Sequence, residues 1–201
     1  MDDPLKLTAY VVQKRFKAGA LTLKIMDANG NQVLKSEGRL LVTRQPLQTM
    51  DGKVISTITR KIMAMSPEYD IHAGDAKGEV TGIVKEPMQL FSSVNLNIEI
   101  KDASGNALAA ASGNFLNMEV DITDSSGNVA AKITRKLDAN GILGKLTQLA
   151  TDSYAIQIVG NSLPPQKVLE FMITLELMLS RNQSSNPGVF TGVPGFGGMR
   201  L

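Results

Sequence analysis

The chain repeats itself at a fixed interval of 75 residues. When the segment 21–61 is aligned without gaps on the segment 96–136, 14 of the 41 positions are identical. The two copies share the turn sequence Asp-Ala-x-Gly-Asn and end in the same four residues, ITRK, at 58–61 and 133–136. A short match can arise by chance, but a gapless registration of turns and apolar positions over this length indicates a duplicated structural unit.

A second match extends the repeat past an insertion. The segment EYDIHA (68–73) resembles DSYAIQI (152–158), which places Tyr69 and Tyr154 85 residues apart. The additional residues fall within 137–150, a segment that could form a long loop or a short helix. We therefore interpret the chain as two related halves with one insertion in the second half.

Both halves carry short runs in which apolar and polar residues alternate, as is typical of β-strands. An Asp-x-x-Gly sequence favours a type I turn followed by a glycine in the left-handed region, and such loops join antiparallel strands. We predict about twelve antiparallel strands, with the spacing of a sandwich or a barrel. The strand-like runs are AYVVQKR, LTLKI, GRLLV, KVISTIT, EVTGIV, VNLNIEI, NVAAKIT and YAIQIV, and the turn sequences are DANGN, MDGK, DAKG, DASGN, DSSGN and a second DANG at 138–141.

One segment, 164–182, departs from this pattern and predicts a helix. Its apolar residues occupy nearly every direction around a helix, so the helix should be buried on all sides. Glu170, Thr174 and Glu176 interrupt the apolar run, and the segment is too short to cross a bilayer. A helix that is buried all round in a β-rich chain requires a tube of strands around it. The apolar residues are Val168, Leu169, Phe171, Met172, Ile173, Leu175, Leu177, Met178 and Leu179.

Composition limits the chemistry that is available to the chain. It contains no cysteine, which excludes disulfides, thiolate metal sites, cysteine nucleophiles and S-acylation. A formal net charge of +2 gives no reason to expect a nucleic-acid partner. Acidic residues stand at the N-terminus where a signal peptide has basic ones, and no apolar run reaches the roughly 18 residues of a membrane span. We therefore expect an intracellular protein without a membrane span.

The order and spacing of these features resemble the LURP-one-related family, within the wider Tubby C-terminal-like group that also includes phospholipid scramblases. The resemblance covers about residues 7–182 and implies a twelve-stranded antiparallel barrel around one central hydrophobic helix. We therefore predict a barrel domain (1–182), followed by a tail (183–201) whose richness in Gly, Pro and Ser indicates flexibility. The late apolar helix and five segments carry the resemblance: YVVQKRF (10–16), IMDANGNQV (25–33), ITRKIMAMSPEYDIHAGD (58–75), VAAKITRK (129–136) and DSYAIQIVG (152–160).

The resemblance implies binding rather than a defined reaction. Tubby relatives bind phosphoinositides through a basic pocket, but we map no residue set of this chain onto that pocket. Scramblase relatives associate with membranes through acylated cysteines and a C-terminal apolar segment, and this chain has neither. The LURP-one-related members are tied in plants to defence without a settled biochemical activity.

Patterns for catalysis and metal binding are weak. His72 is the single histidine, and a lone histidine in a strand favours a packing or surface role. No Gly-x-Ser-x-Gly nucleophile elbow occurs. Asp121, Asp124 and Gly127 lack the spacing of a calcium loop and indicate a hairpin turn. We expect no enzyme activity, no cofactor and no metal.

Basic residues near the predicted strand ends are the better candidates for binding. They could form a surface for lipid headgroups or phosphate groups. Alternatively, they are solvated strand ends that discourage edge pairing. The candidate ligand-binding residues are Lys14, Arg15, Lys17, Arg60, Lys61, Arg135 and Lys136.

Strand alternation also indicates a structural role for two of these arginines. If Ile58 and Ile133 face the interior, Arg60 and Arg135 point inward at a rim of the barrel. The central helix carries Glu170 and Glu176, and an unpaired buried charge is strongly destabilising. Our hypothesis is therefore that Arg60 or Arg135 forms an ion pair with one of these glutamates and fixes the position of the helix.

These patterns together predict a non-enzymatic binding domain in the cytoplasm or peripherally at membranes. Its partner is an anionic phospholipid or phosphoinositide headgroup, or another protein. The alternatives are a scramblase-like protein that moves lipid between leaflets and a structural or interaction scaffold. The sequence leaves the oligomeric state open.

Overall fold

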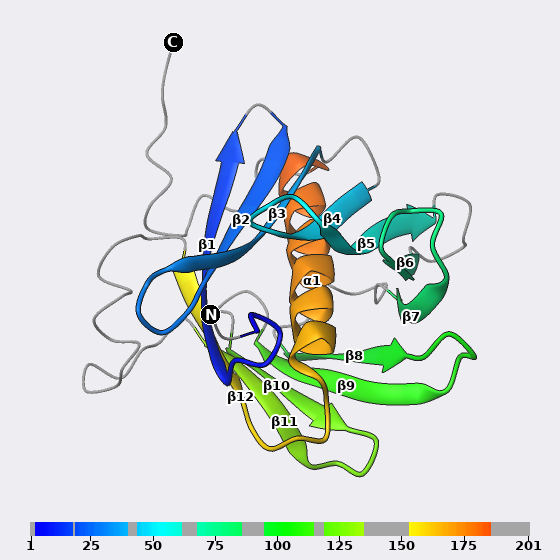
Figure 1. The fold of residues 1–201 in the computed structure, drawn as a ribbon. Coiled ribbons are helices and arrows are strands. Elements are labelled where there is room, and N and C mark those ends of the chain that lie inside the picture. The colour runs from blue at the N-terminus through cyan, green and yellow to red at the C-terminus, as the bar shows by residue number, and fades with distance from the viewer. Residues whose placement is uncertain are drawn as a thin grey trace.

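In the computed structural model, strands from both halves of the chain close into one barrel around a helix (Figure 1). The structure describes residues 3–17, 19–39, 44–61, 68–85, 95–114, 119–134 and 153–185, apart from the side chains of 95, 96 and 181–185. These residues form the strands β1 (Ala9–Lys17), β2 (Ala20–Met26), β3 (Gln32–Arg39), β4 (Arg44–Thr49), β5 (Val54–Lys61), β6 (Glu68–Ala73), β7 (Val80–Lys85), β8 (Asn95–Lys101), β9 (Ala107–Asn114), β10 (Glu119–Asp124), β11 (Val129–Thr134) and β12 (Ser153–Ile158), and the helix α1 (Pro165–Ser185).

The sheet has the simplest possible order, because each strand pairs with its neighbours in the sequence. The barrel closes where β1 pairs with β12, with Val12 opposite Tyr154. Every pairing is antiparallel, so short turns can connect the strands. Closure leaves none of the described strands with an unpaired edge. The predicted barrel of about twelve antiparallel strands is confirmed.

The internal repeat of the sequence is a repeat of the barrel. The first residues of β2, β3, β4 and β5 precede those of β8, β9, β10 and β11 by 75 positions each. The irregularities of pairing repeat as well: the shift at Ile25/Met26 recurs at Ile100/Lys101, and the shift at Leu47/Gln48 recurs at Ile122/Thr123. The two halves are therefore β1–β6 and β7–β12, each contributing six neighbouring strands.

The core forms between the inward faces of the strands and the helix. Alternate residues of β2, namely Leu21, Leu23 and Ile25, are fully buried, and the other strands follow the same alternation. Figure 1 shows α1 running through the middle of the barrel. Every residue of α1 from Val168 to Ser180 is buried, so the predicted all-round burial of the helix is confirmed. Burying each large aliphatic side chain stabilises the fold by roughly 1.5–3 kcal/mol.

The helix extends slightly past its predicted end. It begins at Pro165, where the missing N–H of proline removes no intrahelical bond, and the carbonyl of Pro164 accepts the backbone N–H of Lys167 at 2.9 Å. It ends at Ser185, beyond the predicted boundary at 182. The tail that we predicted for 183–201 lies outside the described residues from position 186 onward.

The run GRLLV at 38–42 was expected to be a strand, but β3 ends at Arg39 and residues 40–43 lie outside the described part of the chain.

Two strands form where the sequence carries weak strand signals. β4 contains Pro46, which has no N–H to donate to a neighbouring strand. β9 is an alanine-rich segment, ALAAASGN, with low intrinsic strand preference. The predicted insertion at 137–150 also lies outside the described residues.

The Asp-x-x-Gly-Asn turns form as the sequence predicts. In the β8–β9 turn, the backbone N–H groups of Ser104 and Asn106 donate to Asp102 Oδ1 at 2.9 Å, and Asn106 Nδ2 donates to Oδ2 at 3.0 Å. Gly105 has a φ of 85° and donates its N–H to the carbonyl of Asp102. The side-chain hydrogen bond from Asn106, followed by its backbone N–H, lowers the pKa of Asp102. The same turn recurs at Asp27 and Asp124.

A matching pair of glycines marks close approaches between neighbouring strands. Gly113 in β9 has a φ of 138°, and a Cβ at this position would collide with the carbonyl oxygen of Glu119 in β10. A Cβ on its equivalent in the first half, Gly38, would also collide, with the carbonyl oxygen of Arg44 and the side chain of Gln45. The shared glycines therefore have a steric reason and do not indicate a ligand.

Replacing Asn106 by Ala should raise the pKa of Asp102 toward its ordinary value, because the variant loses one of the hydrogen bonds to the carboxylate. A lowered folded-state pKa stabilises the fold above the unfolded pKa, and this contribution is lost as the pH falls through the folded value. The stability difference between wild type and Asn106→Ala should therefore shrink from about pH 6 to about pH 2. Carboxyl NMR titration and urea unfolding measure both effects. Ser104→Ala is the control because it keeps the backbone donor, and equal Asp102 pKa values in wild type and Asn106→Ala would contradict the prediction.

Substituting Gly113 by Ala should destabilise the protein more than substituting Gly127 by Ala. Both glycines have positive φ, which costs an alanine roughly 1–2 kcal/mol, but only Gly113 also faces a backbone collision. A Cβ on Gly127 meets no atom within 4 Å. Urea unfolding of both variants should show an additional loss of at least about 1 kcal/mol for Gly113→Ala. Equal losses of stability in the two variants would contradict the prediction, because they would mean that β9 and β10 move apart at Gly113 without a free-energy cost.

Candidate functional site

A buried ion pair joins the middle of α1 to β1. Glu176 Oε2 lies 2.7 Å from Lys14 Nζ, and the exposed fractions of the two side chains are 1% and 15%. An ionised carboxylate inside a protein is strongly destabilising unless a positive group compensates it. Lys14 therefore compensates a buried negative charge inside the barrel. Its predicted role as a ligand-binding residue on the surface does not fit this position.

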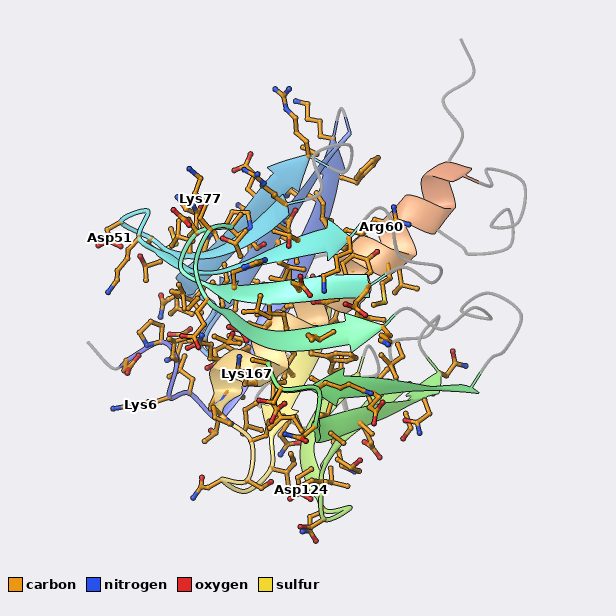
Figure 2. The ribbon with its side chains drawn as sticks, turned by 90° about the vertical axis from the view of Figure 1, so that its right-hand side faces the viewer. Lys6, Asp51, Arg60, Lys77, Asp124 and Lys167 are labelled. Atoms are coloured by element: carbon orange, nitrogen blue, oxygen red, sulfur yellow. The ribbon has the colours of Figure 1, made fainter. Side chains whose placement is uncertain are left out.

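A second buried pair lies near the start of α1. Glu170 accepts a hydrogen bond from Gln166 Nε2 at 2.7 Å and pairs with Lys167 Nζ at 2.9 Å. Lys167 Nζ also donates to Oγ1 of Thr81, the residue after the start of β7, at 3.0 Å. Figure 2 shows Lys167 beside the first turns of the helix. This pair ties the beginning of α1 to the second half of the barrel.

The structure gives these glutamates partners that differ from the expected arginines. Arg60 does lie on the inward face at the end of β5, and Figure 2 shows it beside the last turns of α1. Its Nε is buried without a hydrogen-bond partner, and within the described residues it forms no ion pair. The expected ion pair between Arg60 and a glutamate of α1 is therefore absent among the described residues. Lysines pair with both glutamates instead. Arg135 and Lys136 lie outside the described residues.

Lys61 takes part in an ion-pair network on the outer surface. Its Nζ lies 2.6 Å from Glu68 Oε1 and 2.9 Å from Asp70 Oδ1, and Lys85 approaches Glu68 at 3.7 Å. The hydrogen bonds with Glu68 and Asp70 raise the pKa of Lys61, and Lys61 lowers the pKa of Glu68. The charge of Lys61 is therefore compensated within the protein, so Lys61 is a weak candidate for binding an anion.

His72 forms hydrogen bonds within the fold through both of its ring nitrogens. Its Nε2 lies 2.9 Å from Thr59 Oγ1 and its Nδ1 lies 2.9 Å from the carbonyl of Gly78, so both ring nitrogens hold the β5–β7 region together. Within the described residues, no group of three or more His, Asp and Glu side chains could hold a metal ion. The segment with Asp124 and Gly127 forms the hairpin turn that the sequence indicated, in which Asp124 Oδ1 accepts the backbone N–H groups of Ser126 and Asn128.

The most distinctive surface of the barrel is the outward face of β1–β4, which we call the basic outer face. Strand alternation places six cations on this face and a single acidic residue, Glu37. None of the six forms an ion pair within the described part of the chain. The cations are Arg15, Lys17, Lys24, Lys35, Arg39 and Arg44.

Strand register brings these cations close to one another. Lys24 of β2 lies directly opposite Lys35 of β3. Lys17 and Arg39 flank Ala20 from the two neighbouring strands. Neighbouring strands are about 4.8 Å apart, so like charges in such positions repel each other. Arg15, Lys17, Arg39 and Arg44 are exposed, whereas Lys24 and Lys35 are half-buried and cover apolar surface with their stems.

The equivalent strands of the second half carry the opposite charge. β7–β10 contain two basic and four acidic residues, whereas β1–β4 are almost wholly basic on the outside. At equivalent positions Lys24 is replaced by Glu99, and Arg44 is replaced by Glu119. The charged residues of β7–β10 are Lys85, Glu99, Lys101, Glu119, Asp121 and Asp124. Geometry is thus shared between the halves, but surface charge is not.

Sequence reasoning found a part of this face. Arg15 and Lys17 were predicted as ligand-binding residues, and both lie on the basic outer face. The other four cations, Lys24, Lys35, Arg39 and Arg44, were missed because only the pairing of β1–β4 brings them onto one face with Arg15 and Lys17. The sequence carried part of the signal, since Lys24 and Arg39 lie in runs that were predicted to be strands, whereas Lys35 and Arg44 lie outside those runs.

A depression on strands β8–β10 of the second half differs from the basic outer face in the charge of its lining. Its volume is about 350 Å³, and it is lined by alanines of β9 together with Asn97, Glu99 and Asp124. Two carboxylates in its lining would repel an anionic ligand. No helix within the described residues is long and apolar enough to cross a membrane, as expected for α1.

The variant Lys14→Met should be strongly destabilised, because it leaves the buried Glu176 carboxylate without its counter-charge. Breaking a buried pair in this way costs roughly 3–5 kcal/mol. The double variant Lys14→Met/Glu176→Leu should regain most of this loss, since both charges are removed. Lys6→Met is the control, because the Lys6–Asp3 pair is exposed and contributes at most about 1 kcal/mol. Urea unfolding measures all three variants, and a double variant as unstable as Lys14→Met would show that the pair itself is unimportant.

Comparisons with known proteins agree with the fold. A sequence model of the LURP-one-related family matches residues 7–164. The X-ray structure of a protein from Arabidopsis thaliana is similar to this barrel with a TM-score of 0.56, covering 87% of this chain and 91% of that chain. At 12% sequence identity this likeness shows a shared fold alone. A search of curated proteins returns no match. Since the family model spans most of the barrel, the chain belongs to the LURP-one-related family.

Proposed function

We propose that this protein binds anionic membrane lipids, without catalysing a reaction, through the basic outer face of β1–β4. The binding takes place at a cytoplasmic membrane surface, where anionic headgroups create a negative potential. The observation that carries the proposal is the cluster of six cations without ion-pair partners among the described residues. The membership of the family supports the barrel scaffold and leaves the ligand to be tested.

Repulsion within the basic outer face supports an external anion as its partner. Lys24 and Lys35 are directly opposite each other, and like charges in opposed positions destabilise a sheet. The equivalent position of Lys24 in the second half carries a glutamate, so the barrel geometry does not require a cation there. Bound phosphate groups would compensate the repulsion that the folded protein otherwise retains.

The two arginines suit phosphate recognition in particular. Arg39 ends β3 and Arg44 begins β4, and both side chains are exposed on the outer face. A guanidinium group offers paired N–H donors that match the oxygens of a phosphate. The lysines of the same face add charge without a fixed geometry. A headgroup surface with many phosphates fits such a mixed arrangement better than a single enclosed ligand does.

Vesicle sedimentation tests this proposal. We expect the protein to bind phosphatidylcholine vesicles that contain phosphatidylserine or a phosphoinositide, and to be released by salt. Arg39→Gln/Arg44→Gln should weaken this binding roughly 30-fold, because each cation near an anionic surface contributes about 1 kcal/mol.

A variant of equal net charge provides the control. Lys77→Gln/Lys132→Gln also removes two cations, but from exposed positions outside the basic outer face, and should bind almost as wild type does. Equal weakening by both double variants would indicate an effect of net charge alone. Absence of binding to every anionic vesicle would overturn the proposal and leave a protein partner as the remaining candidate.

A further inference from the structure

The β1–β2 hairpin presents an aromatic side chain at its tip. Phe16 is 54% exposed, while its cross-strand neighbour Leu21 is fully buried. The flanking residues Arg15 and Lys17 are exposed cations of the basic outer face. Exposed scattered apolar residues are common, but an exposed phenyl ring whose two sequence neighbours are cations without ion pairs among the described residues is a more specific arrangement.

The position of Phe16 explains its exposure. By strand alternation it follows Tyr10, Val12 and Lys14 on the inward face of β1, yet it lies near the end of the barrel. Figure 1 shows the β1–β2 hairpin extending at the end of the barrel where α1 finishes. There the ring meets too little of the core to be buried. Gly19 at the tip has a φ of 74°, and no atom lies within 4 Å of where its Cβ would stand, so the tip is sterically open.

We propose that this tip inserts Phe16 into the boundary between headgroups and acyl chains of an anionic bilayer, with Arg15 and Lys17 held at the phosphates. The inference rests on the proposed function and adds how the barrel is oriented on the membrane. An aromatic ring gains from leaving water at this depth, and long basic side chains reach back to the headgroups. Charge complementarity favours a membrane over an apolar groove of another protein, because both neighbours of the ring are cations without described partners.

The chain offers a matched control for this insertion. Among the described residues, Phe16 and Met50 are the two large apolar side chains with high exposure, at 54% and 49%. Met50 lies in the β4–β5 turn beside Asp51, and Figure 2 shows Asp51 on the side of the barrel away from Arg60 and the end of α1. The membrane-bound orientation that we propose therefore keeps Met50 in water.

The absence of tryptophan from the chain makes fluorescence a clean measurement. In the full-length protein, Phe16→Trp should show a blue-shifted emission on phosphatidylcholine vesicles containing phosphatidylserine, and brominated lipids should quench it. Met50→Trp should show neither effect on the same vesicles. Phe16→Ser should weaken sedimentation with these vesicles roughly tenfold, whereas Phe16→Leu should remain near wild type, because a ring or a branched chain gains similarly from leaving water.

The outcomes separate this inference from the proposed function. If the protein sediments with anionic vesicles but the Phe16→Trp emission stays unshifted and unquenched, the insertion is wrong and surface binding stands. If wild type does not sediment with any anionic vesicle, the proposed function fails and the insertion fails with it. A blue shift of Phe16→Trp that appears without vesicles as the protein concentration rises would identify the tip as a protein contact and overturn the inference.

Discussion

The helix α1 is buried on every side from Val168 to Ser180, and this burial is the constraint on which the rest of the structure depends. A sandwich or an open sheet would leave part of the helix in water, whereas a closed barrel surrounds it. Closure between β1 and β12 also places Lys14 within 2.7 Å of Glu176. Burial of the helix, closure of the barrel and pairing of the buried charge are therefore mutually dependent.

The two duplicated halves share their interior geometry, whereas the charged residues of their outer surfaces differ. Turns, bulges and the close-approach glycines Gly38 and Gly113 recur at the same interval because each meets a steric or hydrogen-bonding requirement of the strands. Outward positions meet no such requirement, so Lys24 in one half can stand where Glu99 stands in the other. The result is a barrel with one basic side and one acidic side, and this asymmetry is the basis of the proposed lipid binding.

Much of the fold could be predicted, but the strength of the local signal differed between strands. Alternating apolar residues identify β2, β5, β8 and β11, whereas β4 with Pro46 and the alanine-rich β9 form because the neighbouring strands and the core require them. For the candidate site, Lys14 shares the parity of Tyr10 and Val12, so its inward position could have been read from the sequence. The opposition of Lys24 and Lys35 depends on a register that no local pattern specifies.

The sequence by itself determined the duplicated unit, the Asp-x-x-Gly-Asn turns and a helix that must be enclosed, because each of these follows from spacing along the chain. The tertiary structure alone decided that lysines rather than the expected Arg60 compensate Glu170 and Glu176. It also decided which cations share one face. The physical reason is the same in both cases: electrostatic pairing and repulsion act over a few ångströms, and only the closed, registered barrel sets those distances.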